Sequence, residues 1–199
     1  MAFKLEGKQT ELLLNFREYI DTWTSLITEY HHRGVGDDDI FGALQLDDEQ
    51  ALRFSMEWGT VVLTLAMRTW NQKRLKEDIQ KKVEQAVVEQ VYATIFAGDD
   101  PETLAACKEF YKAHYDMLVQ LAPGKSKKID ELRNELIGFA RYAVAQCSSR
   151  PEEENAQAIE KLSLLLISAM VPFRNLTENT IHDTTSVLGK PRFIVRKKV

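Results

Sequence analysis

The segment at residues 31–39, HHRGVGDDD, gathers side chains that bind metal ions. Histidine nitrogens are common ligands of transition metals, and carboxylates are the usual ligands of Ca²⁺. On one helix, however, the side chains of His31 and His32 point about 100° apart, so they do not readily share a metal ion. A transition-metal site here would need further ligands from elsewhere in the fold. We therefore favour the end of a helix, with Gly34 as its left-handed cap.

The run DDDIFGALQLDD at residues 37–48 can be aligned with the pattern of a calcium-binding loop. That pattern has acids at positions one, three and twelve, which Asp37, Asp39 and Asp48 occupy, and a glycine at position six. Phe41 stands at position five and has no side-chain oxygen, so one ligand is missing. Aspartate at position twelve is also a weaker bidentate ligand than glutamate. We favour an inter-helix loop in which Ile40 and Phe41 pack onto the core.

His114 is the other candidate for chemistry, because it lies on an apolar helical stripe with Tyr111 and Leu118. A core histidine that is hydrogen-bonded to a neighbour is the usual explanation of such a position. A catalytic role would need a carboxylate or a cysteine brought close by the fold. Cys107 is two turns earlier, too far for contact within one helix. The chain has no P-loop, GxGxxG, GxSxG, HExxH or zinc-cysteine motif, which favours a protein that is not an enzyme and predicts no cofactor, with Ca²⁺ or a divalent transition metal left as an alternative.

The elements that must position these residues are helices, because apolar residues recur at helical spacing between sparse glycines and prolines. The segment at about 47–70 is apolar in nearly every direction, which predicts a central helix packed on several sides. Gly59 in its middle predicts the close approach of a neighbouring helix. We expect a kink or break near Asn71, with one long bent helix over 47–97 as the alternative. The other predicted helices cover about 8–33, 101–121, 129–147 and 152–171, the last of them ended or kinked by Pro172.

The predicted fold is therefore an all-α, single-domain bundle of about six helices over residues 1–185, followed by a basic, extended C-terminal tail at 186–199. The 199 residues are 44% hydrophobic, which is enough for one sizeable core. No strand signal of any length occurs before residue 185.

The composition also restricts the class of protein. A net charge of −4 argues against a protein whose whole surface binds nucleic acid. Cys107 and Cys147 are far apart and indicate reduced thiols, which together with an N-terminus lacking an apolar signal region predicts a cytoplasmic protein. The longest apolar run, at 162–173, is shorter than a bilayer span, so we expect a buried helix and no transmembrane segment.

The last ten residues, KPRFIVRKKV, differ from the rest of the chain because they carry five basic side chains and no acid. The chain as a whole carries −4, so residues 1–189 carry −9. A short apolar run between arginines favours docking on a protein, either this chain or another, over contact with the phosphates of a nucleic acid. The residues expected to make this contact are Arg192, Phe193, Ile194, Val195, Arg196, Lys197 and Lys198.

Two functions follow from these patterns. The favoured one is a non-enzymatic helical interaction or scaffold protein, oligomeric, whose tail docks on protein. This hypothesis predicts an exposed apolar patch on the folded chain. The alternative is a metal-dependent or ligand-binding helical protein, an enzyme included, that uses side chains around residues 31–48. Its ligands for Ca²⁺ or a divalent transition metal would be His31, His32, Asp37, Asp39 and Asp48.

Overall fold

A computed structural model describes residues 3–71, 77–98, 100–121 and 129–187 of the chain. This part contains seven α-helices, one short π-helix and no strand, which confirms the all-α class. The elements are α1 (Phe3–Val35), α2 (Asp38–Leu44), α3 (Asp48–Asn71), α4 (Glu77–Tyr92), η1 (Ala93–Ala97), α5 (Pro101–Leu121), α6 (Ile129–Ala145) and α7 (Glu152–Val187).

The central helix is α3, as predicted. It contacts α1, α4, α5, α6 and α7, and every residue from 57 to 67 is buried. Asp47 caps its start. The Gln50 N–H donates to Asp47 Oδ1 at 2.8 Å, and the Asp47 N–H donates to Gln50 Oε1 at 3.1 Å. This reciprocal arrangement satisfies two backbone donors at the helix start.

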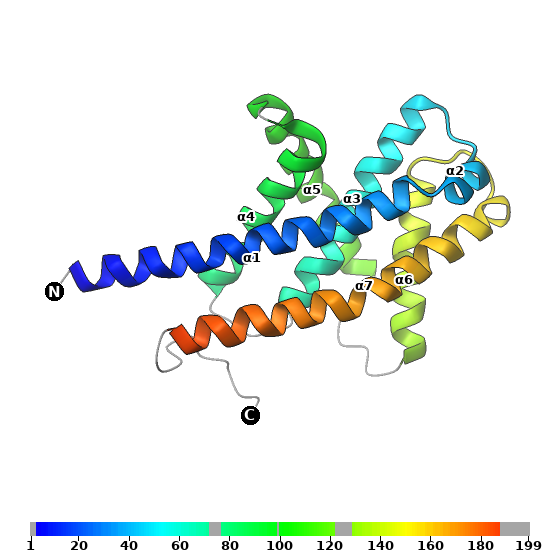
Figure 1. Cartoon of the computed structure of the whole chain (residues 1–199). Coiled ribbons are helices and arrows are strands. Elements are labelled where there is room, and N and C mark those ends of the chain that lie inside the picture. The colour runs from blue at the N-terminus through cyan, green and yellow to red at the C-terminus, as the bar shows by residue number, and fades with distance from the viewer. Residues whose placement is uncertain (1–2, 72–76, 99, 122–128, 188–199) are drawn as a thin grey trace.

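The long helices α1 and α7 lie side by side along the bundle and run in opposite directions (Figure 1). The Trp23 ring of α1 stacks on Phe173 of α7, with 5.9 Å between ring centroids, and Tyr30 also contacts Phe173 at 5.7 Å. In this view α4 crosses behind α1, and the turn where α4 leads into α5 lies on the side of α1 away from α7. The α3 helix ends at Asn71 and α4 begins at Glu77, so the break predicted near Asn71 separates two helices.

The segment after α1 was expected to be a loop, and this expectation is wrong, because it forms the helix α2. The Asp37 carboxylate accepts hydrogen bonds from two N–H groups of the first turn, including that of Ile40 at 3.1 Å. Gln45, with φ of 51°, ends the helix in a left-handed conformation. The predicted packing on the core is confirmed, because Ile40 is buried and Phe41 meets the Phe54 ring edge-on at 5.8 Å.

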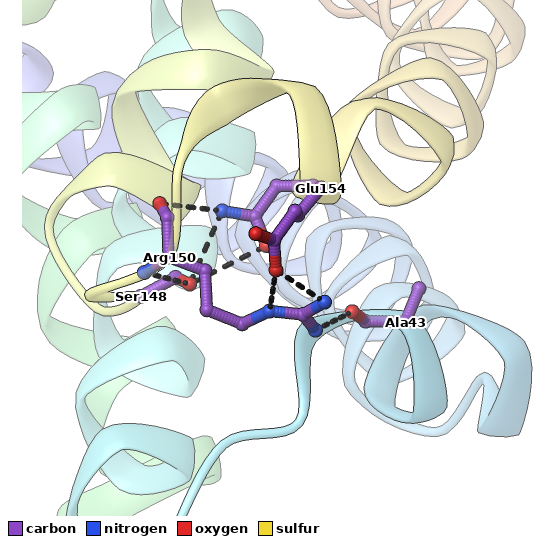
Figure 2. A network of polar contacts seen from close by, with 5 residues as sticks. Ala43, Ser148, Arg150 and Glu154 are labelled. Carbon is purple, nitrogen blue, oxygen red and sulfur yellow. Dashed lines mark hydrogen bonds and ion pairs between the residues drawn. The ribbon is translucent and has the colours of Figure 1, made fainter.

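The connection between α6 and α7 is fastened to α2 by Arg150 (Figure 2). Its guanidinium donates to the Ala43 carbonyl at 2.7 Å and to the Glu154 carboxylate at 2.9 Å. Its own N–H donates to Ser148 Oγ at 3.2 Å, and Asn155 Nδ2 donates to the same hydroxyl at 3.1 Å. Because the Ala43 carbonyl belongs to the last turn of α2, Arg150 satisfies a helix-end acceptor while it positions the start of α7.

Gly34 was expected to be a left-handed cap, but it lies inside α1 with helical backbone. Its role is close approach, since a Cβ built on Gly34 would lie 2.0 Å from Nε1 of Trp58. That nitrogen donates to the Tyr30 carbonyl at 3.2 Å, so the indole cannot move away cheaply. The close approach predicted at Gly59 is confirmed, because a Cβ there would lie 3.3 Å from the His31 ring.

The expectation that α7 ends near residue 171 is also wrong, because α7 continues through Pro172 to Val187, while the alternative of a kink at Pro172 stays a prediction. A proline inside a helix leaves the carbonyl four residues earlier without its N–H donor. That carbonyl belongs to Ser168, and the Tyr30 hydroxyl of α1 donates to it at 3.1 Å. The first two residues of the predicted tail belong to α7, and residues 188–199, which include Arg192 to Lys198, lie outside the described residues.

The Gly34→Ala substitution should lower the free energy of unfolding by about 3 kcal/mol, because the new methyl group overlaps the buried Trp58 ring. Gly138→Ala is the matched control, since nothing lies within 4 Å of a Cβ built there in α6. We expect it to stabilise the protein by about 0.5–1 kcal/mol. Urea unfolding of both variants measures the difference, and equal effects at the two glycines would contradict the close-approach role.

The Tyr30→Phe substitution should lower the free energy of unfolding by about 1 kcal/mol, because the Ser168 carbonyl loses its donor. Pro172→Ala restores an N–H at position 172 that can bond the same carbonyl. In that background we expect Tyr30→Phe to cost less than about half as much. A double-mutant cycle by urea unfolding measures this coupling. Independent, additive effects would show that the hydroxyl does not compensate for the proline.

Candidate functional site

The two adjacent histidines point to different surroundings. His31 is buried, and its Nε2 lies 3.1 Å from the Ser55 carbonyl and 3.0 Å from the Ser55 hydroxyl. The Phe96 ring meets the imidazole edge-on at 5.6 Å. Burial lowers the pKa of His31 to about 4, so its ring is neutral at pH 7. His32 is exposed instead. The structure therefore assigns His31 to the packing between α1 and α3.

The candidate calcium ligands are also separated by their roles. Asp37 caps α2, and Lys161 Nζ of α7 lies 4.0 Å from its Oδ1. Lys161 forms a hydrogen bond and an ion pair with Asp39, which hold the pKa of that carboxyl below its usual range. Asp48 is exposed in the first turn of α3. The described residues contain no group of three or more His, Cys, Asp or Glu that could hold a metal ion, so the metal site stays a prediction.

His32 and Asp37 do meet at one place, an open hollow of about 580 Å³ between α1, α2 and α7. Lys161 and Leu164 of α7 complete it, and sequence reasoning missed both, because they stand more than 120 positions away in the chain. The lining residues are His32, Arg33, Gly36, Asp37, Ile40, Lys161, Leu164, Leu165 and Ser168.

The α7 helix is apolar on two opposite faces. One face packs into the core with alternating steps of four and three, through Leu162, Leu166, Ala169 and Phe173. The other face is exposed, with Leu164 at 54%, Ile167 at 38% and Val171 at 64% of full exposure. We call Leu164, Ile167 and Val171 the outer face of α7. The prediction of a buried helix at 162–173 therefore holds for one face only.

The outer face continues the same spacing into charged residues at both ends. Glu160 precedes Leu164 by four positions, and Arg174 follows Val171 by three. Both charged side chains are exposed. Positions that alternate steps of four and three form the contact line of a helix that packs on another helix. This line has an apolar centre, an acid at its N-terminal end and a base at its C-terminal end.

The same helix is the one part of the described residues that is long and apolar enough to cross a membrane, over Glu152–Ile181, by length and composition. The core helix of a water-soluble protein passes the same test. In α7 the apolar residues are divided between a face that packs on the bundle and the outer face, and 39% of the most apolar window is buried inside the fold. This division explains both its high hydropathy and its exposed apolar side chains.

A partly buried polar cluster joins α3, α5 and α6. The carboxylate of Glu57 is fully buried, and its Oε2 lies 2.9 Å from Nδ1 of His114. The Tyr142 hydroxyl lies 2.8 Å from the same nitrogen, and the Phe110 ring stacks on the imidazole at 4.1 Å. The hydrogen bond predicted for His114 is therefore present, although its side chain is only partly buried, at 17% exposure. Sequence reasoning missed Glu57, although it is the one acid of α3 beyond the first turn.

Nδ1 of His114 has either one hydrogen to donate or one lone pair to accept with, so its hydrogen bonds to Glu57 and Tyr142 depend on its protonation. When Nδ1 of His114 carries a hydrogen, it donates to Glu57, and when it does not, it accepts from the Tyr142 hydroxyl or from a protonated Glu57. Burial raises the pKa of Glu57, and the hydrogen bond from His114 and the charges of His114 and Arg53 oppose this rise. Burial also raises the pKa of Tyr142 to about 12, so its hydroxyl keeps its proton at pH 7. The cluster is closed off from solvent at Glu57, which favours a structural role.

Comparisons of the chain with protein-family models, with curated proteins and with solved structures found no match. The geometry of this chain therefore carries the functional proposal. The outer face of α7 combines apolar residue types, helical spacing and exposure to solvent.

Because burial raises the folded-state pKa of Glu57, the stability that its protonated form contributes is present below the ordinary pKa of 4.5 and is lost as pH rises through the raised value. Glu57→Gln removes this titration while it keeps an amide to bond His114. We expect the variant to gain stability relative to the parent by about 1.4 kcal/mol for each pH unit between the two pKa values. Urea unfolding from pH 4 to pH 8 measures this, with exposed Glu109→Gln as the control. A constant difference across that range would contradict it.

Proposed function

We propose that this protein is a non-enzymatic helical interaction protein that binds a helix of a protein partner on the outer face of α7. The observation that supports the proposal is the exposed apolar line of Leu164, Ile167 and Val171 on a helix whose opposite face lies in the core. Amphipathic helices bind such lines through residues spaced by three and four. Exposed apolar residues that form one contiguous line indicate a binding site more than scattered ones do.

The outer face is rigid enough to act as a platform. The α7 helix contacts α1, α2, α3 and α6, and Arg150 fixes its start against α2. In its middle, Tyr30 bonds the carbonyl that Pro172 leaves free. A surface that is already ordered loses little conformational freedom on binding, so more of its contact energy appears as affinity.

A protein helix suits the outer face better than a membrane surface does. Helices that lie on membranes combine a broad apolar face with many lysines and arginines around it. The outer face is a narrow line, and its two ends carry opposite charges, Glu160 and Arg174. Opposite charges at fixed positions give orientation to a protein partner.

The other parts of the sequence hypothesis stay proposals beside this one. We still propose that the basic tail, from Arg192 to Lys198, docks on protein and that the protein is cytoplasmic and oligomeric. Binding of a metal ion or a small ligand near residues 31–48 is the second candidate. The hollow that joins His32, Asp37 and Lys161 is the observation that favours it.

The triple substitution Leu164→Glu, Ile167→Glu and Val171→Glu should abolish partner binding and leave the fold intact, since all three side chains point to solvent. The experiment captures proteins from an extract of the source cells on immobilised parent and variant chains and quantifies them by mass spectrometry. Leu52→Glu is the matched control, because Leu52 is 63% exposed on α3, outside the outer face. We expect a partner that the parent and the control retain at least tenfold better than the triple variant.

Two results would contradict the proposal. One is the same set of captured proteins on the parent and on the triple variant, when circular dichroism shows that both are folded. The other is binding of the parent, and not of the triple variant, to vesicles of anionic phospholipid. The second result would assign the outer face to a membrane surface.

A further inference from the structure

The outer face of α7 is complementary to itself. Its line of contact positions runs through Glu160, Leu164, Ile167, Val171 and Arg174. We infer that its partner is a second copy of this chain, bound with the two α7 helices antiparallel about a two-fold axis at Ile167. This inference rests on the proposed function, because it names the partner of the same face.

The antiparallel register follows from the spacing. Reversing the line about Ile167 places each Glu160 opposite Arg174 of the other copy. Each Leu164 then lies opposite position 170 of the other copy, one residue from Val171. A two-fold interface uses the same patch on both copies, so every such contact occurs twice. The apolar centre is then closed at both ends by opposite charges. The line from position 160 to position 174 is about 21 Å long at 1.5 Å per residue.

The charges also select the direction of packing. In a parallel pair of α7 helices, Glu160 would face Glu160 and Arg174 would face Arg174, so both ends would repel. In the antiparallel pair both ends attract. Interhelical pairs of this kind set the orientation of packed helices.

Arg174 has a partner in its own helix and still has donors for a second one. Its Nε lies 3.1 Å from Oε1 of Glu178, at a spacing of four residues. A guanidinium has five N–H donors, so it can bond Glu178 and Glu160 of the other copy at once. The Arg174 side chain is 71% exposed, which leaves it accessible to a second copy.

The test is sedimentation equilibrium of the full chain with single charge reversals. In a dimer of Glu160→Arg chains, the new arginine of each copy would face Arg174 of the other, and in a dimer of Arg174→Glu chains two glutamates would face each other. Because like charges then repel at both ends, each variant alone should dimerise about tenfold more weakly than the parent. An equimolar mixture of the two variants restores both attractive pairs. We expect the mixture to form heterodimers about as stable as the parent dimer.

The control is Glu109→Arg, because Glu109 is an exposed acid on α5, outside the outer face of α7. We expect it to dimerise like the parent, and circular dichroism melts check that every variant is folded. Single variants that dimerise like the parent, or a mixture no tighter than either variant alone, would overturn the two-fold arrangement.

Failure of this inference is distinguishable from failure of the proposed function. If the parent stays monomeric at high micromolar concentration and its outer face still captures another protein, the second copy is wrong and the binding face stands. If the parent dimerises and the triple glutamate variant dimerises equally well, the dimer forms through another surface and the inference is wrong.

Discussion

The complete burial of α3 is the constraint on which the rest of the structure depends. Eleven consecutive residues, from 57 to 67, have no exposed face, so other helices must cover α3 on every side. Covering it this closely requires glycines at the contacts with α1. Gly34 makes room for Trp58, and Gly59 makes room for His31. The arrangement of α1, α4, α5, α6 and α7 follows from this one demand.

A helix buried on all sides must also satisfy its polar groups inside the core. Glu57 meets His114 of α5, and the Thr60 hydroxyl bonds the Tyr92 hydroxyl of α4 at 2.6 Å. Arg68 near the end of α3 forms an ion pair with Glu135 of α6. Each polar contact joins α3 to a different helix. These three contacts favour the observed arrangement of helices around α3, whereas the Thr64 hydroxyl and the Trp70 indole nitrogen of α3 are buried without a hydrogen-bond partner among the described residues.

The sequence was sufficient to predict what depends on local pattern. Helical periodicity predicted the all-α class, and the apolar residues on nearly every side of one segment predicted the central helix. Contacts between distant residues were not predictable in this way. Glu57 and His114 are 57 positions apart, and the need for Gly34 depends on Trp58, 24 positions later.

Two errors had a different cause, because the local pattern was ambiguous. The helix α2 is only seven residues long, too short to show a periodic stripe, and its aspartates favour a loop as much as a helix cap. In α7, periodicity shows that two faces are apolar and cannot show which of them is covered. The outer face of α7 was missed for this reason, since an exposed row and a buried row of apolar residues have the same spacing.

The hydrogen bond from Tyr30 to the Ser168 carbonyl joins the middle of α7 to a residue 138 positions away in the chain. A helix that contains a proline cannot satisfy the carbonyl four residues earlier from its own backbone. In α7 that acceptor is satisfied by tertiary packing, through a hydroxyl of α1. The last helix therefore depends on the first one for a hydrogen bond that its own sequence cannot supply.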